Sequence, residues 1–407
     1  MLENLLKDLN AEIESPYLEE AYNKAIKDVN PFYLTEEYLE KIFECKIIKE
    51  NCDVLRTALK GVNKIENLAI FVKILYHLID IGKNNFLVFD KLVLPTAPQN
   101  SEYTIAYDCA SAFAILGHMP KYKEELNALG IEDKICYDTI SLIDINITMG
   151  SEKAGRPICD HETFTSYGAY LYTKTLWIER FRFQLTSSSK YPIYVFKNKN
   201  NDIKIMMRDV YVDKSGYLCG SAGISDENEG AYAELTEGED YYEGYFVDEK
   251  TNLVIPTPQR ISKSEWELIL KPNEDVLKIH VPFGGNFTPE AFDASFSKGE
   301  KVMRALYHDR DIKGICATSW FFTPALKGLL KETSNIMAFR NCFTLYPKKS
   351  QGYDVFEFVF ENPIKSYAEL DVDKLPEDNS LRRGVKELFK KGVYFPEFGA
   401  FRLFNNK

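Results

Sequence analysis

The spacing of apolar residues along the chain changes once, near residue 178. Before that point apolar positions recur at intervals of three and four, which is the period of a helix with one buried face. From Arg180 to Leu185 polar and apolar residues alternate, which is the period of a half-buried strand. The pattern therefore predicts a helical N-terminal domain over 1–178, followed by a domain that contains a sheet. In the most apolar stretch of the first part, the helical stripe consists of Leu68, Phe71, Val72, Leu75, Tyr76 and Ile79.

Start signals locate the helices of the N-terminal part. Ser15-Pro16 opens one helix and Thr35-Glu36-Glu37 opens another, because Ser and Thr cap a helix and Pro is tolerated in its first turn. Further helices are expected over 103–117, 120–128, 138–148 and 162–178.

After residue 178, runs typical of strands alternate with turn residues. Ser262-Lys263-Ser264-Glu265 has the pattern of a capping box and predicts a short helix that carries Trp266. A basic helix is expected at about 381–391, after a polar stretch that contains proline. Strands are expected over 191–196, 203–208, 244–248, 253–256, 342–347 and 354–360.

One junction between a strand and a helix occurs twice, 35 residues apart, at Thr288-Pro289 and at Thr323-Pro324. Thr as the N-cap and Pro as the first helical residue start a helix directly after each strand. We expect helices at about 289–306 and 324–331, and the first is long enough to connect two parallel strands by a right-handed crossover. Helix N-termini at the carboxyl ends of parallel strands attract anions, so a ligand is expected at this edge.

Length and charge narrow the class of protein. The 407 residues are 45% hydrophobic, which is enough for two domains with their own cores. The net charge of −11 argues against a nucleic acid or an anionic membrane as the main partner, because both require a basic face.

The cysteines give no sign of a disulfide framework or a metal site. The chain has 8 cysteines and no Cys-x-x-Cys pair, and Cys159 with His161 lacks the partner pair that a zinc site needs. Nothing at the N-terminus resembles a signal peptide. We therefore expect a reduced, cytoplasmic protein without a metal.

The order of the elements expected after residue 270 resembles the second half of the GNAT acyltransferase fold. More closely, the chain resembles a bacterial family of acyltransferase-domain proteins with a helical N-acyltransferase N-terminal domain and a GNAT-like C-terminal domain. The residues that carry this resemblance are His280-Val281-Pro282, Gly284-Gly285, Thr288-Pro289-Glu290-Ala291, Asp293-Ala294-Ser295, Cys316 to Trp320, Ser334-Asn335-Ile336 and Phe339.

The resemblance implies an α+β protein: a helical N-terminal domain over 1–178, a GNAT-like mixed α/β sheet domain over 179–362, and a C-terminal extension over 363–407. In GNAT proteins two neighbouring parallel strands separate, and the pantetheine of acyl-CoA lies in the gap. The resemblance thus implies acetyl-CoA or another acyl-CoA as co-substrate. The residues implied in binding it are Val281, Gly284, Gly285, Asn286, Phe287, Thr288, Trp320 and Asn335.

The turn after the first strand departs from the usual GNAT phosphate loop. That loop has Arg or Gln, two residues, Gly, one residue, and then Gly or Ala, whereas residues 282–289 read Pro-Phe-Gly-Gly-Asn-Phe-Thr-Pro. Adjacent glycines still allow backbone amides to approach a pyrophosphate, but Glu290 competes for the same helix end. The alternative is that Gly284 and Gly285 only make a tight turn.

The resemblance assigns the catalytic work to His280 and Ser319. A base must take a proton from the attacking amine, and the reference pKa of histidine near 6.5 suits that role at neutral pH. The alternative is a core histidine that hydrogen-bonds to the backbone. Ser319 would orient the acyl group or protonate the leaving thiolate through water, and Trp320 would line the pantetheine tunnel or belong to the core. Ser319 and Tyr307 are the candidates for the general acid.

The segment 226–249 contains ten acidic residues and four tyrosines but no Lys or Arg. One interpretation is a solvated loop and strand edge. The other is an acidic, aromatic gate that attracts a cationic amine through carboxylates and cation-π contacts.

These observations predict an acyl-CoA-dependent N-acyltransferase that passes an acyl group directly to a small-molecule amine. Nucleic acid, membrane and metal are not expected as partners. The alternative is a catalytically inactive, GNAT-derived ligand-binding or scaffold protein.

Overall fold

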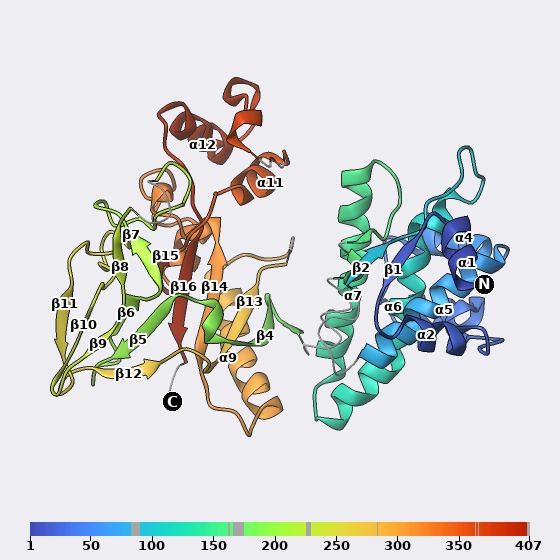
Figure 1. The fold of residues 1–407 in the computed structure, drawn as a ribbon, viewed down its shortest axis with the longest axis horizontal. Coiled ribbons are helices and arrows are strands. Elements are labelled where there is room, and N and C mark those ends of the chain that lie inside the picture. The colour runs from blue at the N-terminus through green and yellow to red at the C-terminus, as the bar shows by residue number, and fades with distance from the viewer. Residues whose placement is uncertain are drawn as a thin grey trace. The chain divides into compact units, whose positions relative to one another are not determined.

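The computed structural model describes residues 1–82, 90–161, 163–165, 175–224, 229–282, 284–362, 364 and 366–404. The chain divides into two compact units, Met1–Ile178 and Glu179–Lys407 (Figure 1). The first unit is mainly helical and the second contains a mixed sheet, as the change in apolar spacing predicts.

The first unit consists of helices with one short antiparallel pair, β1 (Glu12–Glu14) and β2 (Lys91–Val93). Thr35 caps α3 through its hydroxyl, which accepts from Tyr38 N–H at 3.2 Å, as expected. The apolar stripe of the fifth helix is buried at Leu68, Phe71 and Val72. The helices are α1 (Leu2–Asp8), α2 (Leu18–Ala25), α3 (Glu36–Glu44), α4 (Cys52–Val62), α5 (Glu66–Ile81), α6 (Thr104–Ala128) and α7 (Asp133–Ala154).

Helix α6 runs unbroken through Pro120, although the sequence predicts two helices there. Proline has no N–H, so the carbonyl of Leu116, four residues earlier, lacks its helical donor. Tyr38 Oη donates to that carbonyl at 2.6 Å and replaces the missing hydrogen bond. A contact from α3 therefore keeps the helix continuous.

The helix expected over 162–178 is wrong at its end. Residue 162 and residues 166–174 lie outside the described residues, and Leu176–Ile178 form strand β3. Trp177 N–H donates to Thr139 Oγ1 of α7 at 2.8 Å, which fixes this strand beside that helix.

The second unit is built on a mixed sheet. Within this unit its strand order is β15-β16-β14-β13-β4. Only β13 and β14 are parallel, and the other neighbours are antiparallel. Helix α9 (Pro289–Leu306) connects the two parallel strands. The strands are β4 (Phe181–Ser187), β13 (Asp275–His280), β14 (Ile312–Ser319), β15 (Thr344–Pro347) and β16 (Phe398–Leu403).

The mixed sheet has different layers on its two faces. Phe183 of β4 faces α9, where a Cβ atom on Gly299 would lie 2.3 Å from its ring. On the opposite face, Val276 and Cys316 pack in one apolar cluster with Ile193 of β5 and Ile205 of β6. Because side chains alternate along a strand, Lys278 and His280 share the face of Val276.

Smaller sheets complete the second unit. The strands expected over 191–196 and 203–208 are present as β5 (Ile193–Lys197) and β6 (Ile203–Met207), which pair with each other, and β5 also pairs with β12 (Glu267–Leu270). Of the strands expected over 244–248 and 253–256, Gly244 ends strand β10 (Tyr241–Gly244), and the rest form isolated bridges between Met206 and Phe246 and between Val247 and Val254. The others are β7 (Val210–Val212), β8 (Ala231–Ala233), β9 (Thr236–Glu237), β10 (Tyr241–Gly244) and β11 (Gln259–Ser262).

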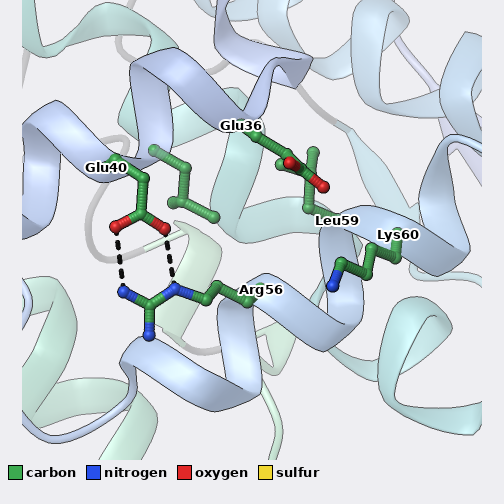
Figure 2. Close-up of a pocket in the computed structure, with 6 residues that line it drawn as sticks. Glu36, Glu40, Arg56, Leu59 and Lys60 are labelled. Atoms are coloured by element: carbon green, nitrogen blue, oxygen red, sulfur yellow. Dashed lines mark hydrogen bonds and ion pairs between the residues drawn. The ribbon is translucent and has the colours of Figure 1, made fainter.

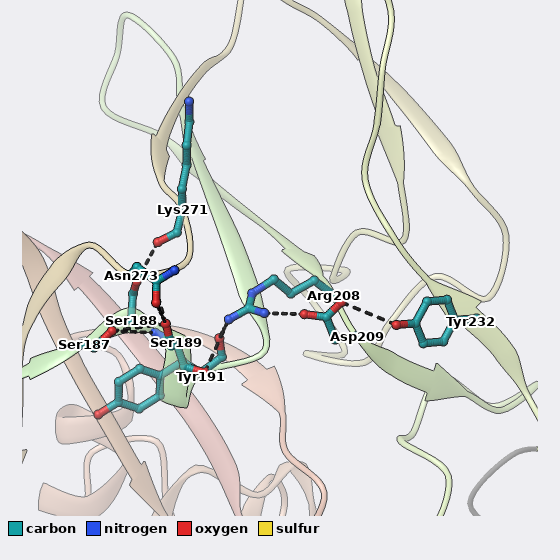
Figure 3. A network of polar contacts seen from close by, with 9 residues as sticks. All are labelled: Ser187, Ser188, Ser189, Tyr191, Arg208, Asp209, Tyr232, Lys271 and Asn273. Atoms are coloured by element: carbon teal, nitrogen blue, oxygen red, sulfur yellow. Dashed lines mark hydrogen bonds and ion pairs between the residues drawn. The ribbon is translucent and has the colours of Figure 1, made fainter.

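A polar network ties the end of β4 to the turn before β13 (Figure 3). Ser188 Oγ donates to the carbonyl of Lys271 at 2.5 Å, and Ser189 Oγ donates to Asn273 Oδ1 at 2.5 Å. Arg208 continues the network toward β7, since its guanidinium donates to the carbonyl of Tyr191 at 3.1 Å. These bonds hold the carboxyl end of β4 in register with the amino end of β13.

Two short elements were predicted with the wrong type. Asp354–Phe360 is helix α11 and not a strand. Val355, Phe356, Val359 and Phe360 are buried at helical spacing, while Phe358 is 59% exposed. The helix expected at Ser262 is also wrong, because β11 ends at Ser262 and a turn leads into β12 at Glu267.

The second Thr-Pro junction starts only a single turn. Pro324–Leu326 forms a 3-10 turn, and the side chain of Thr323 makes no capping hydrogen bond. Gly328 has φ +82°, so the chain leaves the helical conformation there and the expected helix over 324–331 does not form. The next helix is α10 (Asn335–Arg340).

The tail over 363–407 is integrated into the fold. It contains the basic helix as α12 (Ser380–Lys390), in agreement with the sequence. Strand β16 then lies between β14 and β15 in the mixed sheet, which places Ala400 opposite Ala317 and Leu345. The segment described as a C-terminal extension therefore supplies an internal strand.

Candidate functional site

The two parallel strands separate at their carboxyl ends. Their ladder ends at the pair Lys278 and Cys316. Beyond it, His280 pairs with Arg182 of β4, and Ser319 pairs with Phe398 of β16. Among the residues that the structure describes, each strand thus keeps its outer neighbour beyond this pair, while no ladder pair joins β13 to β14 there. A strand edge without a ladder partner is a place where an extended ligand can pair.

The turn after β13 leads directly to the N-terminus of α9. Gly284 and Gly285 have φ +70° and +73°, a left-handed conformation that glycine adopts without strain, and both are exposed. Thr288 Oγ1 caps α9 by accepting from Ala291 N–H at 3.4 Å. Val281 is half-buried and Asn286 is exposed. The turn therefore presents its backbone to solvent beside a helix N-terminus, and Phe283 lies outside the described residues.

Aromatic contacts bring the ends of the two strands together. The ring of Phe287, in the turn after β13, lies 5.7 Å from the ring of Phe321, two residues after β14. Phe287 also contacts Phe292 of α9 at 4.6 Å and Phe339 of α10 at 5.2 Å. The residues proposed from the first strand end and from the second strand end thus share one edge of the sheet.

His280 lies at this edge in a cationic environment. Its Nε2 is 3.3 Å from Gln184 Oε1 on β4. Burial, and then the charges of Lys278 and Arg182, lower the pKa of His280 to about 3. The imidazole is therefore neutral at pH 7, but the neighbouring cations oppose its protonation. Lys278 has a lowered pKa for the same reasons: burial first, then Lys190, Lys348 and Arg182.

The other residues proposed for the site have different surroundings. Ser319 Oγ accepts from Phe321 N–H at 3.2 Å, at the end of β14. Trp320 is buried in an apolar cluster with Val355 and Phe356 of α11. Asn335 is exposed at the first position of α10. Tyr307 follows the last residue of α9, so it lies at the opposite end of that helix from Thr288.

Three polar residues that the sequence did not single out reach the same edge. Lys348 follows β15, Glu397 precedes β16 and Asp354 begins α11. Lys348 Nζ lies 2.9 Å from Glu397 Oε2, and the Asp354 carboxyl hydrogen-bonds Glu397. Burial and the Glu397 carboxylate raise the pKa of Asp354 to about 6, against the opposing effect of Lys348.

The register explains why these residues belong to the site. Pro347 lies opposite Phe398, and Phe398 lies opposite Ser319, so Lys348 and Glu397 extend from the edge where β14 ends. Figure 1 shows α11 beyond that end of the sheet. We name Asp354, Glu397 and Lys348 the carboxyl pair with its lysine. In the sequence, Asp354 stands at the start of the apolar run 354–360, but the run predicts a strand, so the sequence does not identify Asp354 as a site residue.

Two cations, Arg260 in β11 and Lys263 just after it, pair with acidic residues of the segment 226–249. Lys263 Nζ lies 2.7 Å from Glu237 Oε1, and Arg260 forms an ion pair with Glu243. The same two cations cover aromatic rings, with Arg260 4.4 Å from the centroid of Tyr241. These contacts pair two of the ten acidic side chains, Glu237 and Glu243, with cations and favour the interpretation as a solvated surface.

A small pocket lies in the first unit, between α3 and α4 (Figure 2). Its volume is about 70 Å³, which suits a few water molecules but not a coenzyme. Arg56 crosses it and binds both carboxylate oxygens of Glu40, at 2.7 and 2.9 Å. The lining residues are Glu36, Leu39, Glu40, Arg56, Leu59 and Lys60.

No three His, Cys, Asp or Glu side chains in the described ranges are arranged to hold a metal ion. Likewise, none of the described helices is both long and apolar enough to cross a membrane.

Comparisons with solved structures find the same fold in acyltransferases. One is an acyltransferase in complex with decanoyl-CoA, with a TM-score of 0.61 and 13% identity over 99% of both chains. A second is an acyltransferase in complex with decanoyl-CoA and teicoplanin, with a TM-score of 0.59 and 15% identity over 99% of both chains. A third is a mutant acyltransferase in complex with octanoyl-CoA, with a TM-score of 0.56 and 15% identity over 99% of both chains. At these identities the likeness establishes the fold.

No curated protein matches the sequence. The model of one protein family does match, over residues 177–399, which is more than half of the chain. The matched range contains the separated strands, the turn at Gly284 and Gly285, and Glu397. The chain belongs to the family of proteins with a GNAT-like C-terminal domain.

Proposed function

We propose that this protein is an acyl-CoA-dependent N-acyltransferase that passes an acyl group directly from coenzyme A to an amine. The observation that carries the proposal is the separation of β13 and β14 beyond Lys278 and Cys316, next to an exposed turn and the N-terminus of α9. The acyl-CoA complexes of the proteins that share the fold support it.

The proposed binding mode uses both sides of the gap. The pantetheine lies between the free edges of β13 and β14, where peptide groups pair with its amides as a third strand would. The pyrophosphate lies on the amides of about 284–288, where exposed backbone N–H groups and the helix dipole favour an anion. Val281 and Thr288 bound this turn, and Ser319 borders the gap from β14.

The reaction needs one proton acceptor and one proton donor. The amine nitrogen bonds to the thioester carbonyl carbon, the C–S bond breaks, and the sulfur leaves as a thiolate that takes up a proton. The proton lost by the amine goes to a base. Ser319 is proposed to orient the carbonyl, because its hydroxyl retains a donor after accepting from Phe321 N–H.

Two groups compete for the role of base. His280 is neutral and lies on β13 beside the gap, but a pKa of about 3 makes it a weak acceptor. Asp354 has a pKa of about 6, close to neutral pH, and its carboxyl group hydrogen-bonds Glu397. Both groups lie at the edge where the strands end, so the pH dependence of the rate distinguishes them.

The acceptor is proposed to be a small molecule with an amino group. The complex of a protein of this fold with teicoplanin supports a small-molecule acceptor. An amine acceptor is protonated at neutral pH and must lose a proton before it attacks, so it needs a base such as His280 or Asp354.

The rival is a ligand-binding or scaffold protein that keeps the cleft and has lost turnover. Two observations favour it: the turn lacks the Arg or Gln of the usual phosphate loop, and cations surround His280. Such a protein binds acyl-CoA without releasing the thiol.

Turnover is tested by incubating the protein with acetyl-, octanoyl- and decanoyl-CoA and a panel of primary amines. Mass spectrometry of the products is preferable to a thiol reagent, because Cys45 is exposed and reacts with such reagents. The proposal expects an amide product and free coenzyme A in equal amounts. Binding without any amide across the panel would instead establish the rival.

A further inference from the structure

Arg180 lies buried beneath the turn that follows β13. It immediately precedes β4 and is only 8% exposed. Its Nη2 donates to the carbonyl of Pro282 at 2.9 Å, and its guanidinium lies 5.4 Å from the centroid of the Phe287 ring. The cation therefore contacts both ends of the segment 282–287.

The neighbouring residue anchors this position to the first two turns of α9. Phe181 N–H donates to Ser295 Oγ at 3.0 Å, and the Phe181 ring stacks on Phe292 at 5.8 Å. Because α9 begins at Pro289, these contacts place Arg180 at the N-terminal end of the helix. The guanidinium and the positive end of the helix dipole thus act on the same turn.

The charge of Arg180 has no carboxylate partner among the described residues. Its Nε is buried and makes no hydrogen bond within them, and burial alone lowers its pKa. A buried cation without a counter-ion is costly, so it marks a place where an anion is expected to bind.

Arg340 shows what a purely structural arginine looks like in this protein. It is also buried, but its guanidinium donates to the carbonyls of Phe321 and Thr323 and to Asn252 Oδ1. Its donors hold the segment after β14. Arg180 makes one such bond and leaves further donors unused in the described structure.

We infer that Arg180 supplies the positive charge that holds the phosphate groups of coenzyme A at the turn 284–288. The cation comes from β4, the neighbour of β13, and not from the turn itself. This inference rests on the proposed function only for the identity of the anion. Arg180 gives the turn 284–288 the cation that the sequence of the turn lacks. Its positive charge also opposes the negative charge of Glu290 at the same end of α9.

The test compares ligands with and without phosphate. Decanoyl-CoA carries the phosphates, whereas decanoyl-pantetheine has the same thioester and pantetheine without them. Calorimetry with Arg180→Gln is expected to show decanoyl-CoA binding weakened on the order of 10–100-fold, because charge-assisted hydrogen bonds are lost. Decanoyl-pantetheine binding should stay within about twofold. The affinity of Arg180→Lys for decanoyl-CoA should lie between those of wild type and Arg180→Gln, since lysine keeps the charge but lacks the planar guanidinium with its paired donors.

Arg304→Gln is the matched control, because it removes the same charge from the exposed C-terminal part of α9. It should leave both affinities unchanged. Equal loss of both ligands in Arg180→Gln would assign Arg180 a structural role and overturn the inference, as would unchanged decanoyl-CoA binding.

Inorganic pyrophosphate separates this inference from the proposed function. If wild type binds pyrophosphate and Arg180→Gln does not, the anion site stands even where decanoyl-CoA fails to bind, and the proposed function alone is refuted. If wild type binds neither pyrophosphate nor decanoyl-CoA, the anion site itself is overturned.

Discussion

Lys278 of β13 and Cys316 of β14 form the last pair in the parallel ladder between these strands. On the far sides, pairing continues to His280 with Arg182 and to Ser319 with Phe398. The sheet is thus held together by its outer neighbours while it opens in the middle. The ladder ends beside the N-terminus of an 18-residue helix, an arrangement that suits an extended, anionic ligand.

Gly285→Val should weaken acyl-CoA binding. The glycine has φ +73°, and a β-branched residue in that conformation is strained by about 1–2 kcal/mol, so the turn is expected to rearrange. The matched control is Gly130→Val in the first unit, where φ is also +73° and no atom lies within 4 Å of the added Cβ. Calorimetry should show reduced affinity only for Gly285→Val. A similar affinity in both variants would place the pyrophosphate elsewhere.

The pH dependence should identify the base. If Asp354 accepts the proton, kcat/KM falls as pH decreases through about 6, because the pKa of Asp354 is about 6 and its carboxylate becomes protonated, and Asp354→Asn removes this limb. If His280 is the base, its pKa of about 3 gives no limb between pH 5 and 8, and His280→Ala lowers kcat by about 10²–10⁴-fold. A pH-rate profile of wild type and both variants decides between them. Full activity of Asp354→Asn with an unchanged profile would remove the carboxyl pair from the mechanism.

The same carboxyl pair should affect stability in a defined direction. The pKa of Asp354 is raised in the folded protein, so its contribution to stability is present at low pH and is lost as pH rises through about 6. Asp354→Asn, which cannot ionise, should therefore raise the melting temperature at pH 8 relative to wild type and change it little at pH 4. Thermal melts at both pH values check this. A larger gain at pH 4 than at pH 8 would contradict the assigned environment.

Helix α11 can be distinguished from a strand by two substitutions. Phe356→Ala removes a fully buried ring and should cost about 3–5 kcal/mol. Phe358→Ala removes a ring that is 59% exposed and should cost less than about 1 kcal/mol. In a strand these residues would lie on the same face, so chemical denaturation with equal losses for both would contradict the helix.

The sequence was sufficient where local rules and tertiary contacts agree. The stripe of α5, the cap of α3, the crossover helix α9 and the parallel pair β13 and β14 follow from periodicity and capping. Prediction from the sequence failed where a residue distant in the chain determines the local structure. Tyr38 keeps α6 intact at Pro120, and burial by neighbouring elements selects the helix over the strand at 354–360.

The site was only partly predictable for the same reason. The turn at Gly284 and Gly285, His280 and Ser319 lie at one edge, as the strand order requires. Glu397 and Lys348 reach that edge only because β16 inserts between β14 and β15, and no local sequence pattern predicts that insertion. The buried environment of Arg180 likewise depends on the packing of α9 against β4.

A bulky side chain that fills the gap between β13 and β14 should exclude acyl-CoA if the ligand binds there. Thr318 lies on β14 just beyond Cys316, and Thr344 lies on the same face of the sheet in β15, away from the gap; both are half-buried. The measurement is calorimetric titration of decanoyl-CoA into wild type, Thr318→Trp and Thr344→Trp, with melting temperatures to confirm folding. If acyl-CoA lies in the gap, wild type and Thr344→Trp should bind decanoyl-CoA alike, and Thr318→Trp should lose affinity by about tenfold or more. Equal binding by both folded variants, or no binding by wild type, would contradict this placement.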